Sequence, residues 1–208
     1  MKRIAVFVSG GGTNLQALMD AQAAGELGGG QIVLVLASNT KAHAIERAKQ
    51  AGIPWVVVSK KACGSEEEFD ARMIGPLREH HIDLVVLAGY LSYVSGSVLR
   101  EYEGRILNIH PSLIPSFCGK GFYGLKVHQA VLAAGVKVTG ATVHFVNEIY
   151  DGGAILLQRA VEVLPEDTPE SLQLRVMQQA EWILLKQAVA AWCQGKIRLV
   201  EGKAWMTE

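Results

Sequence analysis

Asn108 and His110 place an amide and a titratable imidazole two residues apart, in the segment N-I-H-P-S-L-I-P of residues 108–115. The aliphatic run before them predicts the end of a buried strand, and side chains two apart on a strand share a face. Pro111 cannot donate to a sheet ladder, so the strand should end there and open into a loop. Ligands bind at this carboxyl edge in open α/β sheets. The pair suits a reaction in which a carbonyl oxygen gains negative charge while protons move.

A plainer interpretation stays open, because an Asn and a His at a strand end are often polar groups that cap a loop. Two further features favour chemistry: the acidic element D-G-G at residues 151–153 and a glycine-rich turn near the start of the chain. None of the three features decides the matter alone. Together they indicate an active site.

The glycine-rich turn, S-G-G-G-T-N at residues 9–14, joins the first predicted strand to the first predicted helix. Its main-chain N–H groups and the positive end of the helix dipole favour an anion, so we expect a phosphate monoester there. A dinucleotide fingerprint is disfavoured, because Leu15 takes the place of its third glycine and Ser38-Asn39 stands where the ribose-binding acid belongs. The Gly-Lys-Ser/Thr of a P-loop is missing. A connector without a ligand remains the alternative.

The composition argues against several classes of protein. The chain has 208 residues with 20 Lys and Arg against 20 Asp and Glu, so it has no electrostatic footprint for nucleic acid or an anionic membrane. No apolar run approaches membrane-spanning length, and the N-terminus has no signal-peptide pattern. Cys63, Cys118 and Cys193 are odd in number and far apart, which indicates free thiols in a reducing compartment. We expect a cytoplasmic protein that binds neither nucleic acid nor membrane.

Short aliphatic runs alternate with helical stretches through the first half of the chain. We predict strands at residues 4–8, 32–37, 55–58, 84–88 and 106–109, and helices near 14–24, 42–51, 65–81 and 95–102. These strands are continuous apolar runs, as expected of a parallel sheet covered on both faces.

The rhythm changes after Pro115. The later elements are a helix at residues 125–134, antiparallel strands at 138–146 and 155–163, a last helix at 169–194 and a tail hairpin at 197–200 and 204–206. The predicted fold class is therefore α/β: one Rossmann-like domain over residues 1–208, with a mostly parallel twisted sheet, helices on both faces and an antiparallel addition near the C-terminal half.

Five motifs together resemble the phosphoribosylglycinamide formyltransferases, a branch of the folate-dependent formyltransferase family. They are S-G-G-G-T-N-L-Q-A (residues 9–17), L-A-G-Y (87–90), N-I-H-P-S-L-I-P (108–115), G-A-T-V-H-F-V (140–146) and D-G-G (151–153). The strand-end motif and D-G-G are shared by folate-dependent formyltransferases generally. The glycine turn followed by T-N-L-Q-A is specific to the glycinamide ribonucleotide branch.

The resemblance implies transfer of the formyl group of 10-formyltetrahydrofolate to the amine of N1-(5-phosphoribosyl)glycinamide in purine biosynthesis. It implies a mononucleotide-binding half, residues 1–105, and a folate-binding and catalytic half, residues 106–208. The folate is a co-substrate and no metal is expected. The partners would be small-molecule substrates only, while the oligomeric state, monomer or dimer, stays open.

The resemblance also assigns roles to residues of this chain. The catalytic positions are Asn108, His110 and Asp151. The substrate phosphate would bind Gly12, Thr13 and Asn14, and the ribose would bind Glu181. The folate pteridine would bind Leu91, Ser92, Tyr93, Val94 and Asn108.

These assignments give a mechanism. Amine attack on the formyl carbon makes an oxyanion, which a cationic His110 and the amide of Asn108 would stabilise; losing one such donor typically costs about 10²–10³ in rate. Asp151 would raise the pKa of His110, because an opposite charge favours the protonated imidazole. His110 or a held water would carry the proton from the amine to the leaving folate nitrogen.

Three positions depart from the family pattern. Glu66 stands where many relatives carry a basic residue that meets the folate, which leaves Lys60, Lys61 and Arg72 as substitutes. Trp182 replaces the usual His after Glu181, so the register there is open by one residue. The loop at residues 116–124 is longer than in some members and is predicted to be a mobile lid over the site.

The remaining histidines carry weaker predictions. His144 either lines the same pocket or is a satisfied core residue. The others are predicted to lie on the surface or at helix ends, namely His43, His80, His81 and His128.

Three rival functions stay open. A relative that formylates methionyl-tRNA would share the catalytic elements, but the chain lacks a basic surface for nucleic acid. Hydrolases of formyltetrahydrofolate carry an extra N-terminal regulatory domain. A non-catalytic nucleotide-binding module would need the phosphate turn but not all of Asn108, His110 and Asp151.

Overall fold

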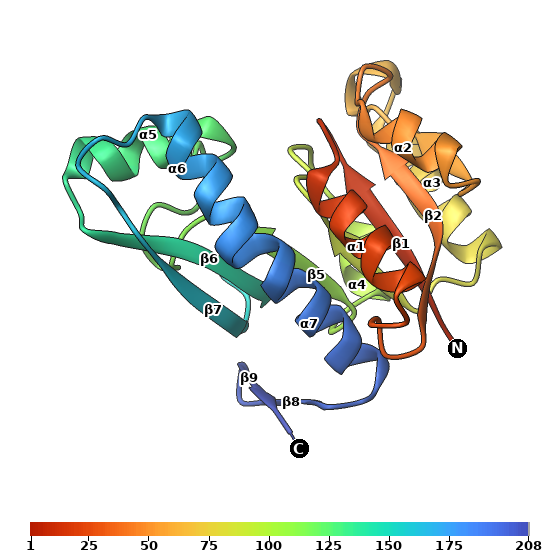
Figure 1. Ribbon diagram of the computed structural model, residues 1–208. Helices are drawn as coiled ribbons and strands as arrows, with labels where there is room; N and C mark the ends of the chain where they lie inside the picture. The colour runs from red at the N-terminus through yellow and green to blue at the C-terminus, as the bar shows by residue number, and fades with distance from the viewer. Residues whose placement is uncertain (208) are drawn as a thin grey trace.

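A seven-stranded sheet forms the centre of the computed structural model, which describes residues 1–207 (Figure 1). The strand order is β3-β2-β1-β4-β5-β6-β7; β1 to β5 are parallel, and β6 and β7 join as antiparallel neighbours. The bounds are β1 (Lys2–Val8), β2 (Gly30–Ala37), β3 (Trp55–Val57), β4 (Leu84–Leu87), β5 (Ile106–His110), β6 (Val138–Phe145) and β7 (Ile155–Glu162). The predicted α/β fold, with its antiparallel addition, is confirmed.

Helices cover both faces of the sheet. They are α1 (Thr13–Ala23), α2 (Ala44–Gln50), α3 (Glu66–Glu79), α4 (Gly96–Glu101), α5 (Leu125–Ala134), α6 (Pro169–Val176) and α7 (Trp182–Cys193). Successive residues of β1 point to opposite faces, so Val6 belongs to the hydrophobic cluster that includes residues of α1, α2, α5, α6 and α7, whereas Phe7 belongs to the cluster with residues of α3 and α4. Burial on both sides explains why these strands are continuously apolar.

The strand order reverses beside β1, which lies between β2 and β4. Loops that follow neighbouring strands leave in opposite directions at such a point and open a crevice at the carboxyl edge. Ser9 ties this edge together: its hydroxyl lies 2.7 Å from that of Ser38 and accepts a 2.7 Å hydrogen bond from the N–H of Leu91. The loops after β1, β2 and β4 are therefore fixed relative to one another.

The last long helix departs from the sequence prediction. It is not one continuous α-helix over residues 169–194, because a π-helical turn, Met177–Glu181, separates α6 from α7. A π-helical turn inserts an extra residue into the helical register, and such turns are frequent at functional sites. Amphipathic periodicity does not reveal this single insertion.

The chain ends in the predicted hairpin, β8 (Ile197–Val200) and β9 (Lys203–Met206), which pairs as a separate two-stranded sheet. Among residues 1–207, none of the helices combines the length and apolar character needed to cross a membrane.

Candidate active site

A cavity of about 590 Å³ opens at the carboxyl edges of β1, β4 and β5. It brings together most of the residues singled out from the sequence: Gly12, Thr13, Asn14, Leu91, Ser92, Tyr93, Asn108, His110, Asp151 and Glu181. Val94 is the exception, because its side chain is buried in the core beside α3 rather than on the cavity wall. The volume is typical of small-molecule sites.

Asn108 and His110 project from the same face of β5, as their spacing predicts. The antiparallel neighbour β6 sets Thr142 opposite His110 and His144 opposite Asn108. The polar side chains at this strand end therefore come from two adjacent strands, and the sequence separates those strands by about 30 residues.

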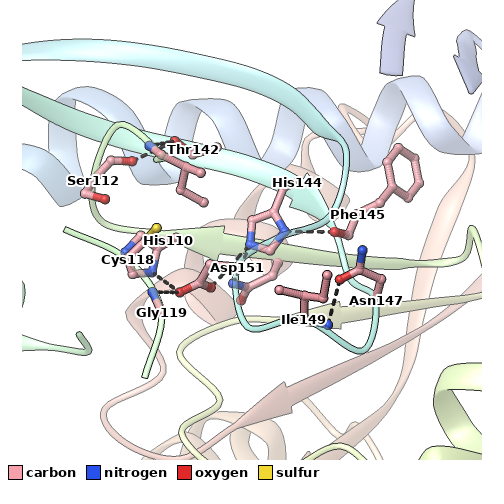
Figure 2. A network of polar contacts seen from close by, with 12 residues as sticks. His110, Ser112, Cys118, Gly119, Thr142, His144, Phe145, Asn147, Ile149 and Asp151 are labelled. Carbon is pink, nitrogen blue, oxygen red and sulfur yellow. Dashed lines mark hydrogen bonds and ion pairs between the residues drawn. The ribbon is translucent and has the colours of Figure 1, made fainter. Parts of the chain in front are cut away.

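Asp151 reaches the end of β5 from the loop between β6 and β7 (Figure 2). The two glycines after it allow this path: a Cβ on Gly153 would lie 1.8 Å from the carbonyl oxygen of Phe145, and one on Gly152 would lie 2.5 Å from Ile149. The N–H of Gly119 donates to Asp151 Oδ2 at 2.8 Å. The motif D-G-G thus has a packing reason as well as a chemical one.

The carboxylate of Asp151 lies between two imidazoles. Its Oδ2 is 3.7 Å from His110 Nδ1, and its Oδ1 is 3.5 Å from His144 Nε2. Burial acts to raise the pKa of Asp151, but its hydrogen bonds, among them the one from the Gly119 N–H, lower it by more, so the pKa lies below its usual value. Asp151 is therefore a carboxylate at neutral pH.

His110 uses one ring nitrogen for the main chain. Its Nε2 lies 2.9 Å from the carbonyl oxygen of Phe117, and Ser112 Oγ donates to the carbonyls of Ser116 and Phe117 at 2.6 and 3.3 Å. A carbonyl oxygen only accepts, so Nε2 carries the hydrogen in this contact. The other nitrogen, Nδ1, is left to face Asp151 and the cavity.

The expectation of a cationic His110 at neutral pH is wrong. Burial lowers the pKa of the imidazole by more than the Asp151 carboxylate and the Phe117 carbonyl raise it, so the net shift is downward. The sequence reveals the charged neighbour but not the depth of burial, and the residue is only 4% exposed. His110 is thus neutral at pH 7.

His128 was also predicted wrongly. It lies fully buried on α5, and neither ring nitrogen has a hydrogen-bond partner within residues 1–207. Burial lowers its pKa to about 4, so the ring is neutral. The three other histidines predicted to lie on the surface or at helix ends do so: His43 and His81 are exposed, and His80 is half-buried.

The glycine-rich turn presents bare main chain to the cavity. The carbonyls of Gly10 and Gly11 are occupied by Ala44 N–H at 3.1 Å and Arg47 Nε at 2.9 Å. The N–H groups of the first turn of α1 have no partner within a helix and face its open end. Gly12 holds a left-handed conformation with φ +73°, and a Cβ there would lie 2.6 Å from Ala44 Cβ. The turn thus presents main-chain N–H groups, the kind of group that binds anions at helix N-termini.

Glu181 belongs to the π-helical turn and lies beside the glycine-rich turn in the cavity wall. Its Oε2 accepts a 2.7 Å hydrogen bond from Asn14 Nδ2, and the residue is 6% exposed. Burial raises the pKa of Glu181 to about 7, against the opposing effect of the Asn14 hydrogen bond. The predicted position is thus an acid in the cavity wall, and Trp182 follows it at the start of α7.

An apolar rim surrounds the other end of the cavity. Its exposed side chains are Leu91, Tyr93, Tyr123 and Tyr150. Of the three basic residues considered for the folate tail, Lys60 is placed at this rim: its Nζ lies 4.3 Å from the ring centre of Tyr93 and 2.9 Å from a Glu66 carboxylate oxygen. Arg72 instead pairs with Glu68 at 2.7 Å.

Several contributors have no signal in the sequence. The carbonyl of Phe117 and the N–H of Gly119 act through main-chain atoms, which residue types do not reveal. Gln173 on α6 and Met177 at the start of the π-helical turn also line the cavity. Within residues 1–207, no three His, Cys, Asp or Glu side chains cluster as metal ligands would; the expectation of a metal-free reaction stays a prediction.

Comparison with known proteins gives a consistent result. A family model described as formyl transferase matches residues 2–188. Phosphoribosylglycinamide formyltransferase of Haemophilus influenzae is 38% identical over 206 residues, which are 99% of this chain and 94% of that protein. The chloroplastic enzyme of the same name from Arabidopsis thaliana is 42% identical over 95% of this chain and 67% of its own length.

One solved structure has the same fold over the whole chain. Glycinamide ribonucleotide transformylase 1 from Symbiobacterium toebii superimposes with a TM-score of 0.92 at 38% identity, covering 100% of this chain and 95% of that one. Other relatives are longer: this chain spans 13% of a trifunctional purine biosynthetic protein of Drosophila melanogaster.

Proposed function

The chain belongs to the formyl transferase family, and on that premise we propose that it transfers the formyl group of 10-formyltetrahydrofolate to the amine of N1-(5-phosphoribosyl)glycinamide. The observation that carries the proposal is the convergence of Asn108, His110 and Asp151 on the cavity that also contains the bare glycine turn. The three side chains suit formyl transfer, and the glycine turn suits the phosphate of the acceptor.

The cavity accommodates the two substrates end to end. The phosphate binds the N–H groups of residues 10–14 at the start of α1, and the ribose hydroxyls bind the Glu181 carboxyl group. The pteridine of the folate binds against Leu91, Ser92 and Tyr93, and the tail of the folate leaves the cavity past the apolar rim. The formyl carbon then lies between these ends, beside the end of β5 where Asn108 and His110 project.

His110 moves the proton in this reaction. Its unprotonated Nδ1 takes the proton from the amine as the amine nitrogen bonds to the formyl carbon, directly or through a held water. The Asp151 carboxylate, 3.7 Å away, stabilises the imidazolium as it forms. His110 then returns the proton to the folate nitrogen as its bond to the formyl carbon breaks, and the neutral imidazole is regenerated.

Asn108 stabilises the charge that develops on the formyl oxygen. Its amide is a neutral donor held at the strand end, so it needs little reorganisation when the tetrahedral oxyanion forms. The protonated His110 adds a second donor at the same moment. The mechanism thus keeps the predicted roles but produces the cationic His110 during the reaction instead of before it.

The three cysteines are free thiols, which fits the reducing cytoplasm that the sequence predicts. The expected partners are the two small-molecule substrates.

The test is an assay of purified protein with 10-formyltetrahydrofolate and glycinamide ribonucleotide, with the N-formyl product measured by mass spectrometry. Transfer to the amine supports the proposal. Release of formate to water at the same rate without the acceptor would indicate a hydrolase instead, and formylation of methionyl-tRNA in its place would indicate the tRNA branch.

A further inference from the structure

His144 lies behind Asn108 on the neighbouring strand, and the following inference rests on the function proposed above. The two residues are directly opposite in the antiparallel pairing of β5 with β6. The His144 ring is 2% exposed and is not part of the cavity wall. Its contacts decide whether it is a plain core residue or a part of the catalytic arrangement.

The main chain fixes one nitrogen of this ring. His144 Nδ1 lies 2.8 Å from the carbonyl oxygen of Phe145 (Figure 2). The carbonyl only accepts hydrogen bonds, so Nδ1 must carry a hydrogen. In a neutral ring, the other nitrogen is then a pure acceptor.

That acceptor nitrogen, Nε2, contacts the side-chain amide of Asn108. His144 Nε2 lies 3.0 Å from Asn108 Nδ2, which is always a donor. Asp151 Oδ1 is farther from the same nitrogen, at 3.5 Å, a longer separation than the contact with the Asn108 amide. The short contact with Asn108 therefore needs a neutral His144 without a hydrogen on Nε2.

We propose that His144 is a positioning residue: the acceptor nitrogen of its neutral Nδ1–H tautomer holds the Asn108 amide in one of its two orientations. An unrestrained amide can turn over and present its oxygen where the oxyanion needs a donor. Fixing the amide before the reaction removes that reorganisation, which is the source of oxyanion-hole catalysis. His144 acts on the formyl oxygen only through Asn108.

The first test is a double-mutant cycle on kcat. His144→Phe should lower kcat by about 10- to 100-fold, as expected of a small misplacement of a catalytic group, with KM for both substrates little changed. In an Asn108→Ala background the same change should have no further effect, because the group through which His144 acts is gone. A full additional loss in that background would overturn the proposal.

His144→Gln is the conservative variant, because the Gln amide oxygen lies where Nε2 of histidine lies and can accept from Asn108. It should recover most of the kcat that His144→Phe loses; equal kcat in the two variants would count against the proposal. Thr139→Val is the matched control, since it removes from the same strand a buried hydroxyl that has no hydrogen-bond partner within residues 1–207, and it should leave kcat unchanged.

A measurement on the unmutated enzyme covers the case in which a variant does not fold. Nitrogen-15 NMR at neutral pH should show His144 protonated at Nδ1 and unprotonated at Nε2. A hydrogen on Nε2 would overturn the inference, while the proposed function would stand if the enzyme still formylates its acceptor. Absence of transfer in the unmutated enzyme would instead overturn the proposed function.

Discussion

In the function proposed above, the two ends of the cavity recognise their ligands by different means. At the phosphate end, residues 10–14 offer main-chain N–H groups at the start of α1, and no side chain caps that helix. At the chemical end, side chains from β5, β6 and the following loop contact one another within 3.0 to 3.7 Å. One end depends on the lack of Cβ atoms, and the other on the ionisation of imidazole and carboxyl groups.

This difference predicts that one end is sensitive to added side chains and the other to protonation. Main-chain N–H groups do not titrate, and recognition through them fails when a side chain occupies the turn. Side-chain catalysis depends on protonation, and burial of His110 and Asp151 shifts both pKa values. Substitutions at the two ends should therefore separate binding from chemistry.

The largest effect is expected at the chemical end. His110→Ala removes the group that carries the proton and should lower kcat by about 10²–10⁴-fold. KM for the phosphorylated acceptor should change little, because the glycine turn is untouched. Steady-state kinetics would check this, with exposed His43→Ala as the control; a kcat near the unmutated value would contradict the mechanism.

Asp151→Asn should combine a loss of rate with a shift in pH dependence. The unmutated enzyme needs neutral His110, so kcat/KM should fall as the pH drops through the His110 pKa, which lies below its usual value of 6.5. The Asp151 charge raises that pKa, so its removal should move the acid limb to still lower pH. A kcat/KM profile from pH 4.5 to 9 would show this; a limb that moves upward would contradict the assigned pairing.

Gly12→Ala should instead affect the phosphate end. The residue needs a positive φ, and the added Cβ would meet Ala44 Cβ at 2.6 Å, so the change should cost about 1–3 kcal/mol of stability and raise KM for the acceptor. Gly11→Ala is the matched comparison, because no atom of residues 1–207, apart from those of its chain neighbours, lies within 4 Å of its added Cβ. It should raise the same KM without lowering Tm. Equal Tm values for the two variants would show that the positive φ of Gly12 and its close approach to Ala44 do not restrict this position.

The smallest effect on rate, but a clear one on stability, is expected for Glu181→Gln. The Glu181 carboxyl group has a pKa of about 7 when folded against a reference of 4.5, so the folded state binds the extra proton between these values. Stability should therefore fall as the pH rises from about 4.5 to about 7, by about 3 kcal/mol. Glu181→Gln should flatten that slope in urea unfolding at pH 5 and pH 8. If the stability of Glu181→Gln depended on pH as that of the unmutated protein does, the pKa assigned to Glu181 would be wrong.

Much of the fold was predictable because its signals are local. Continuous apolar runs identified β1 to β5 of the buried sheet, and Pro111 marked the end of β5. The spacing of Asn108 and His110 predicted that they share a face, since strand geometry alone requires it. The single helix predicted over residues 169–194 failed where an insertion of one residue, invisible to periodicity, forms the π-helical turn.

The sequence by itself determined which chemical groups the protein has: an amide and an imidazole at a strand end, a carboxylate before two glycines, and a turn without side chains. The tertiary structure alone decided their state. Burial, set by packing from distant elements, made His110 neutral and raised the pKa of Glu181. Desolvation and cross-strand register depend on what surrounds a group in space, and residues far apart in the chain supply those surroundings.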